Sequence, residues 1–137
     1  MLLVVDTNII VNALKAPEKY DENGERILSK SERLIRDVLS GKHTMVVSKA
    51  IMDEYEDVLS RERLQLDPVL VAKFLAIVKI NAVWIEPLPT LQSEVEMKDE
   101  DDRVFFDAAK CLNVKLVTRN LHHYPVHELR TSIDELY

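Results

Sequence analysis

The sequence has little cysteine, little glycine and no long hydrophobic run. Cys111 is the only cysteine in 137 residues, so neither an intrachain disulfide nor a cysteine-rich metal cluster can form, and a cytoplasmic, reducing location is favoured. The apolar opening of residues 1–5 is far shorter than the ~20 residues that span a bilayer, and we expect no membrane association. Two glycines and no biased tract argue against a disordered or collagen-like chain.

An excess of positive charge is also missing. The chain carries 24 acidic and 18 basic residues, which excludes a protein whose whole surface is basic for binding nucleic acid. The acidity is local, because residues 94–107 contribute −5 of the formal net charge of −6. The length and the 47% hydrophobic content predict one globular domain over residues 1–137 with a single core.

Apolar runs and amphipathic segments alternate along the chain. The pattern predicts strands at 1–5, 43–47, 82–85 and 114–118, helices at 9–15, 25–40, 49–63, 68–79 and 102–112, a loop at 17–24, and a short strand or helix at 126–136. Ser48 is expected to cap the third helix, and Pro68 to stand in the first turn of the fourth. The alternation predicts an α/β fold with a mostly parallel sheet covered on both faces.

Basic side chains form two features. One face of the helix expected at 25–40 carries a basic stripe of Arg26, Lys30, Arg33 and Arg36. We predict that this stripe helps to dock RNA or an acidic partner, although an ordinary exposed helix face explains it equally well. His122 and His123 are adjacent in sequence, so we do not expect them to ligate one metal ion together, and we assign them surface or structural roles.

Polar side chains follow two of the predicted strands. Asp6 and Asn8 follow the first strand, where the Asp6 carboxylate either holds a hard divalent cation or caps the next helix. Thr118 ends the strand at 114–118, and Asn120 follows it. Because ligands of parallel sheets lie beyond the carboxyl ends of the strands, all four residues are candidates for one site.

Two helices add further acids. Glu54 and Glu56 flank the apolar face of the third helix on opposite sides, and periodicity does not choose between them. Asp102 begins the last predicted helix on its buried side, and Asp99, one turn earlier, is either its cap or a second metal ligand.

The topology can bring these acids to one edge of the sheet. Like charges gathered there repel one another and shift their pKa values unless a cation compensates. Mg²⁺ or Mn²⁺ fits because both prefer oxygen ligands. An acidic site that holds such a cation suits phosphodiester hydrolysis, in which the metal activates a water and stabilises the leaving oxygen.

Four segments carry a resemblance to a known family: LLVVDTNIIVNAL (2–14), VVSKAIMDEYEDVLSRE (46–62), KDEDDRVFFDAAK (98–110) and VTRNLHHYP (117–125). They resemble the conserved blocks of the PIN domain, a family of small metal-dependent ribonucleases that includes many toxins of toxin–antitoxin pairs. The closing segment is similar to that of one subgroup, with a threonine, an asparagine, a histidine, an aromatic residue and a proline.

The resemblance implies a three-layer α/β/α fold with four or five strands. It places the family's glutamate at Glu54, and it implies a catalytic set of Asp6, Glu54, Asp102 and Asn120. It further implies Mg²⁺ (or Mn²⁺) held by Asp6 and Asp102 with help from Glu54 and Asp99, while Asn8 and Thr118 support the site.

Asn120 departs from the commonest pattern, because many PIN domains carry a fourth aspartate there. An amide supplies an oxygen ligand without negative charge, so we expect one well-held cation. Arg119 stands where the subgroup often has glycine. The expected reaction is hydrolysis of single-stranded RNA to 5′-phosphate and 3′-hydroxyl ends. The expected partners are RNA, a small antitoxin and a second copy of the chain.

Other classes stay open at this point. Asn120 keeps open a catalytically weak PIN scaffold that binds nucleic acid or protein. A metal-dependent phosphatase of the haloacid dehalogenase type also begins with a strand that ends in aspartate, but it needs a second acid where this chain has Asn8. A phospho-receiver domain needs paired acids after the first strand and an aspartate in mid-chain, and neither is found.

Overall fold

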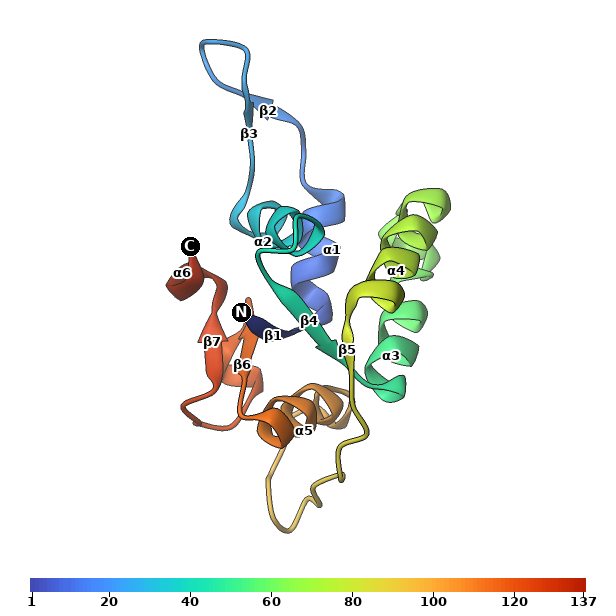
Figure 1. Ribbon diagram of the computed structural model, residues 1–137, viewed down its shortest axis with the longest axis vertical. Coiled ribbons are helices and arrows are strands. Elements are labelled where there is room, and N and C mark those ends of the chain that lie inside the picture. Colours follow the sequence, from blue (N-terminus) through green and yellow to red (C-terminus); the bar gives the residue numbers. More distant parts are fainter.

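A sheet of five parallel strands forms the centre of the molecule (Figure 1). The computed structural model describes residues 1–137, and the strand order is β5-β4-β1-β6-β7. The strands are β1 (Leu2–Val5), β4 (Thr44–Val47), β5 (Val83–Trp84), β6 (Lys115–Thr118) and β7 (Arg130–Ser132). The predicted α/β class and parallel sheet are confirmed.

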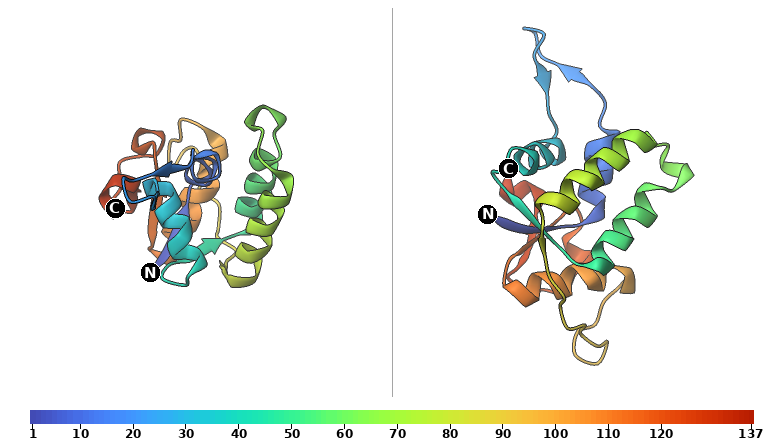
Figure 2. Two further views of the ribbon diagram at one scale, coloured as in Figure 1. Left: turned by 90° about the horizontal axis from the view of Figure 1, so that it is seen from above. Right: turned by 45° about the vertical axis from the view of Figure 1, so that its right-hand side comes forward.

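The helices are α1 (Thr7–Lys15), α2 (Lys30–Leu39), α3 (Lys49–Leu59), α4 (Pro68–Asn81), α5 (Arg103–Leu112) and α6 (Ile133–Leu136). Short 3₁₀ turns lie at η1 (Glu62–Leu64), η2 (Glu100–Asp102) and η3 (Leu121–His123). α1 and α2 lie on one face of the sheet and α5 on the other, while α3 and α4 pair beside the β4–β5 edge (Figure 2). None of the helices combines the length and the apolar composition needed to cross a membrane.

Burial on both faces explains the apolar runs of the central strands. Leu3, Val4 and Val5 of β1 have no exposed surface, and β1 pairs with β4 on one side and β6 on the other. A strand covered on both faces has no polar side to alternate with, so its sequence is continuously hydrophobic. This is the local signal that identifies β1 from the sequence.

Helix caps fix where α3 and α4 begin. Ser48 Oγ accepts a hydrogen bond from the backbone N–H of Ile51 at 3.2 Å, which caps α3 as predicted. Pro68 is the first residue of α4, as predicted, and Asp67 caps that helix by accepting from the N–H of Val69 at 2.9 Å.

The predicted start of the helix at 25–40 is wrong, because the helix begins at Lys30. Ser29 Oγ accepts from the Glu32 N–H at 3.2 Å, and the Glu32 carboxylate accepts from the Ser29 N–H at 3.0 Å. This capping box starts α2 at Lys30. The preceding residues, which include most of the expected loop at 17–24, form an antiparallel hairpin of β2 (Lys19–Tyr20) and β3 (Arg26–Ile27) that projects from the molecule (Figure 1).

The basic stripe is consequently not one helix face, because Arg26 belongs to β3. Its side chains are also engaged: Arg26 with Glu32 at 2.7 Å, Lys30 with Asp134 at 2.7 Å, Arg36 with Asp37 at 3.4 Å, and Arg33 over the ring of Tyr137 at 4.9 Å. Three of the four cations therefore already have an acidic partner, which weakens the case for RNA docking there.

Other boundaries also differ from the prediction: α1 begins at Thr7 rather than at residue 9, α4 ends at Asn81 rather than at residue 79, and β5 covers only Val83–Trp84 of the expected 82–85. The helix expected at 49–63 ends at Leu59, because Arg61 has an extended backbone conformation that separates η1 from α3. The segment at 126–136 contains both predicted elements, since β7 is followed directly by α6.

Candidate active site

The carboxyl ends of β1 and β6 bring the first candidate residues together. Asp6 directly follows β1, is 5% exposed, and its backbone N–H donates to the carbonyl of Val117 in β6 at 3.0 Å. Thr118, the last residue of β6, is fully buried. The parallel pairing of these strands therefore places Asp6 beside Thr118, although more than a hundred residues separate them.

Three donors surround the Asp6 carboxylate. Oδ2 accepts from the hydroxyls of Thr118 and Tyr124, each at 2.9 Å, and Oδ1 accepts a longer bond of 3.4 Å from the Asn8 N–H. Burial raises the pKa of Asp6, and these hydrogen bonds partly offset the rise. The contact with Asn8 also caps α1, so the capping role considered for Asp6 is real and coexists with its place in the site.

Thr118 organises the polar groups around Asp6. Its hydroxyl donates to Asp6 and accepts from Asn8 Nδ2 at 3.3 Å and from the Asn120 N–H at 3.0 Å. Asn8 Oδ1 in turn accepts from the Arg119 N–H at 3.3 Å. The hydroxyl thus uses its one proton and both lone pairs, which holds the ends of β1 and β6 in one arrangement.

Asp102 stands at the start of α5, and 17% of its side chain is exposed. Its pKa is raised from 3.8 to about 7, first by burial and then by the charges of Asp6, Asp99 and Glu54. His123 Nδ1 lies 3.8 Å from Asp102 Oδ2. Burial is thus the main reason why ionised Asp102 is disfavoured, and the neighbouring acids add to it.

The structure distinguishes Glu54 from Glu56. Glu54 is partly buried, and its pKa is raised by burial and then by the charge of Asp101, with a smaller effect from Asp99. Glu56 is exposed and forms an ion pair with Lys79 of α4 at 2.7 Å. Of the two residues that periodicity left open, only Glu54 lies near the other predicted acids. We call Asp6, Glu54, Asp99 and Asp102 the acid cluster.

The donors fit a hard divalent cation in chemistry, although the side chains are not gathered into a complete coordination shell. No three histidine, cysteine, aspartate or glutamate side chains stand where they could hold a metal ion together. Asp6, Glu54, Asp99 and Asp102 nevertheless supply only carboxylate oxygens, and three of them have raised pKa values. A bound cation would relieve that repulsion, and oxygen donors suit Mg²⁺ or Mn²⁺.

Asp99 and Asn120 hold less central positions. Asp99 is exposed, and its carboxylate accepts from the Asp101 N–H at 3.0 Å, so it caps η2. The Asn120 backbone binds Thr118, but its side-chain amide forms no hydrogen bond within the protein. The Asn120 amide is therefore free to contact a ligand, whereas Asp99 has a structural role as well.

Sequence reasoning missed Tyr124 as a site residue. Its ring is 3% exposed, and its hydroxyl binds Asp6 across 118 positions of sequence. The aromatic residue of the closing segment was the available signal, but nothing in the sequence indicates which distant carboxylate it reaches.

Arg103 was also missed. This arginine is 7% exposed and donates to the Glu100 carboxylate at 2.7 and 2.8 Å, to Thr90 Oγ1 at 2.8 Å, to Gln92 Oε1 at 2.5 Å and to the Val95 carbonyl at 2.8 Å. It thereby ties the irregular segment before η2 to the start of α5. The position of Asp102, its direct neighbour, depends on that attachment.

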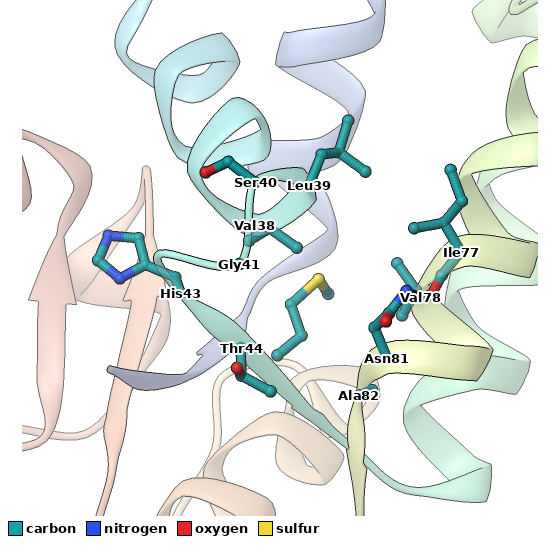
Figure 3. A pocket seen from close by; sticks show the side chains of 11 residues that line it. Val38, Leu39, Ser40, Gly41, His43, Thr44, Ile77, Val78, Asn81 and Ala82 are labelled. Atoms are coloured by element: carbon teal, nitrogen blue, oxygen red, sulfur yellow. Dashed lines mark hydrogen bonds between the residues drawn. The ribbon is translucent and has the colours of Figure 1, made fainter.

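A separate cavity of about 250 Å³ lies at the opposite end of the sheet, where β4 begins (Figure 3). It is lined by α2, β4 and α4, including Leu39, Thr44 and Ile77, and by none of the candidate site residues. The His43 ring points away from the other labelled side chains. The cavity brings together no group of acids or bases, so it is not the active site.

Comparison with known proteins identifies the family of the chain. The family profile of the PIN domain matches residues 2–122, which includes every site residue predicted from the sequence but not Tyr124. No curated protein matches the chain. Because the match covers most of the sequence and agrees with the parallel sheet, the chain belongs to the PIN domain family, whose members are generally metal-dependent nucleases.

Proposed function

We propose that this protein is an endoribonuclease that hydrolyses single-stranded RNA with Mg²⁺ or Mn²⁺. Membership of the PIN domain family supports a nuclease. The observation that carries the proposal is a set of carboxylates that lack compensation: Asp6 and Glu54 have raised pKa values, and Asp102, raised to about 7, has only His123 as an ion-pair partner. These carboxylates would repel the phosphates of RNA, so the site needs a bound cation to accept RNA.

Asp6 and Asp102 would hold the cation, assisted by Glu54 and Asp99. When bound, a divalent cation activates water and offsets the negative charge that develops on the phosphate. The hydroxyls of Thr118 and Tyr124 both donate to Oδ2 of Asp6, whereas Oδ1 accepts only the 3.4 Å hydrogen bond from the Asn8 N–H. Oδ1 is therefore the Asp6 oxygen available to a ligand.

Asn120 favours one cation over two, because its amide supplies an oxygen without charge. Its side chain forms no hydrogen bond in the protein and can orient either a ligand or a phosphate oxygen. We propose that water attacks the phosphodiester and leaves 5′-phosphate and 3′-hydroxyl ends.

The test compares the purified wild-type protein with Asp102→Asn and with Asp53→Asn on a single-stranded RNA. Asp53 is the matched control, because its side chain is 59% exposed on α3 and pairs with Lys49 away from the acid cluster. We expect chelation or Asp102→Asn to abolish cleavage and Asp53→Asn to leave it unchanged. Equal cleavage by the wild type and Asp102→Asn would refute the assignment and indicate a contaminating ribonuclease.

One alternative is a PIN scaffold that binds nucleic acid or protein without strong cleavage. The uncharged Asn120 and the lack of a complete three-ligand cluster favour it. A Mn²⁺ titration followed by thermal unfolding separates the two, since an intact metal site is stabilised by its metal. Stabilisation of the wild type but not of Asp102→Asn supports the nuclease, and no stabilisation supports the binding module.

We further propose that the protein is a cytoplasmic toxin neutralised by a small antitoxin, because its closing segment resembles that of a toxin subgroup. The single cysteine is consistent with a reducing compartment. A short open reading frame directly beside the gene, whose co-expression relieves growth arrest, is the expected finding. Normal growth of cells that express the active nuclease without the product of that neighbouring reading frame would contradict a toxin role.

A homodimer is proposed on the same resemblance, and the surface of α4 supports it. Val69, Ile77 and Ile80 are exposed on this helix at 60%, 40% and 81%. Exposed apolar side chains gathered on one helix are typical of an interface. Light scattering coupled to size exclusion should give twice the mass of one chain, and Ile80→Lys should lower it to that of a monomer.

A further inference from the structure

A pocket of about 310 Å³ opens beside the acid cluster, between the segment before η2 and the turn η3. Its lining includes the buried or partly buried Met97, Tyr124 and Pro125 and the exposed Lys98, His122 and His123. It adjoins the candidate site at two points, because Tyr124 binds Asp6 at 2.9 Å and His123 lies 3.8 Å from Asp102.

We propose that this pocket is a nucleotide subsite, which takes the unpaired base next to the phosphodiester that is cleaved, while Lys98 contacts a neighbouring phosphate. The inference rests on the proposed ribonuclease function and assigns the residues that bind the substrate beside its reacting bond.

The lining suits a nucleobase. Met97 and Tyr124 are 5% and 3% exposed and give the pocket an apolar floor. The exposed rings of His122 and His123 stand nearly perpendicular, at 86° with 5.4 Å between centroids, so each presents a face in a different direction. Proteins that read single-stranded RNA stack unpaired bases on such aromatic faces, and imidazole is among the rings they use.

The charges of the pocket suit the rest of a nucleotide. The two basic residues of the acidic segment 94–107 are Lys98 and Arg103, and Arg103 is committed to Glu100. Lys98 is exposed, forms no ion pair and stands at the pocket, so it can meet a phosphate that the acids would otherwise repel. Glu96, also in the lining, offers an acceptor to an amino group of the base.

The pocket requires a base that is free to leave its neighbours. Its volume of about 310 Å³ is at the lower end of the range for small-ligand sites and accommodates one base. A base in an A-form duplex is stacked and paired, so it cannot enter. Only an unpaired nucleotide can place its base there while its phosphate lies near Asp6 and Asp102.

The first experiment combines His122→Ala with an abasic scan of a short single-stranded oligoribonucleotide in a double-mutant cycle. One abasic position next to the cleaved bond should lower the wild-type kcat/KM by about 5- to 100-fold. His122→Ala should lose a similar factor on the intact substrate and become insensitive to that abasic position. His122→Phe, which keeps an aromatic face, should restore the sensitivity, and Tyr20→Ala, an exposed aromatic residue of the hairpin, should leave it unchanged.

The second experiment measures binding without cleavage, by fluorescence anisotropy of the same oligoribonucleotide on the Asp102→Asn background with chelator. Lys98→Ala should reduce the slope of log Kd against log salt by about 0.7, the value for one phosphate contact on a single strand. Lys73→Ala, an exposed lysine of α4, is the control and should not change the slope.

The two hypotheses fail separately. The subsite is overturned if the loss of kcat/KM from His122→Ala simply adds to the loss at every abasic position and Lys98→Ala leaves the salt slope unchanged. RNA cleavage as the proposed function would survive that result. Absence of metal-dependent cleavage in the wild type would overturn the proposed function, and the anisotropy measurement would still decide whether this pocket binds a nucleotide.

Discussion

Replacing Asp102 by asparagine should stabilise the metal-free protein at neutral and alkaline pH. In the unfolded chain this carboxyl ionises near its ordinary pKa of about 3.8, whereas in the folded protein it ionises at about 7. Unfolding between these values releases a proton. The contribution of Asp102 to stability is therefore fully present below about pH 4 and is lost as the pH rises through about 7. Asparagine does not titrate, so the advantage of the variant grows over this window.

The magnitude follows from the pKa of Asp102. A rise of about three units corresponds to an upper limit of about 4 kcal/mol, at about 1.4 kcal/mol for each unit. The side chain is 17% exposed at the rim of the site, so solvent screening and relaxation reduce the effect. We expect the variant to gain about 1–2 kcal/mol in free energy of unfolding, which raises the Tm by roughly 3–7 °C for a chain of this length.

Thermal and urea unfolding in chelator, at pH 4.5 and at pH 8, would measure this gain. Asp53→Asn removes the same charge from an exposed position and should change stability by less than about 0.5 kcal/mol at either pH. Saturating Mn²⁺ should reverse the order of the wild type and Asp102→Asn, because only the wild type keeps both proposed ligands.

Equal stability of Asp102→Asn and the wild type at pH 8 in chelator, with Asp53→Asn behaving as expected, would contradict this prediction. That result would mean that burial and the neighbouring acids do not disfavour the ionised form of Asp102. An equal gain at pH 4.5 and pH 8 would also refute it, because the stabilisation would then have no electrostatic origin.

Three further changes test the surroundings of the site. Arg103→Lys should weaken Mn²⁺ binding by about 10-fold in a thermal-shift titration, because lysine cannot hold the segment before η2 in the same way; unchanged Mn²⁺ affinity would remove its positioning role. Tyr124→Phe removes a donor from the buried Asp6 carboxylate and should cost about 1–2 kcal/mol in urea unfolding, whereas a neutral effect would mean that this hydrogen bond is not formed in solution. Tyr137→Phe removes the hydroxyl that donates to Asp37 and holds the pKa of that carboxyl below its usual range, so its loss of Tm should be largest at neutral pH and disappear as the pH falls below about 4; a pH-independent loss would contradict this origin.

The parts of the fold that could be predicted are those with a local signal. The apolar run that becomes β1 and the caps of α3 and α4 depend on neighbouring residues alone. The helix expected at 25–40 was wrong because Ile27 and Leu28 continue the helical phase, while the capping box of Ser29 and Glu32 sets the true start. A periodic pattern and a cap signal then compete, and the hydrogen-bonded cap prevails.

The candidate site was predictable as a set of residues but not as an arrangement. Asp6 and Asp102 follow from their places at the ends of elements, whereas the choice of Glu54 over Glu56 depends on α4, which supplies Lys79 to pair with Glu56. The role of Tyr124 depends on η3 folding back on β1. Helical phase describes one helix and cannot say which neighbour each side of it meets.

The sequence alone determines the alternation of strands and helices, the concentration of acid in residues 94–107 and the family resemblance of four segments. The tertiary structure decides which side chains surround Asp6, because Thr118 and Tyr124 reach it from 112 and 118 positions away. The chemistry of each side chain follows from the sequence alone. Burial and the distances between charges, which set the pKa of Asp102, arise only when the sheet brings the carboxyl ends of its strands to one edge.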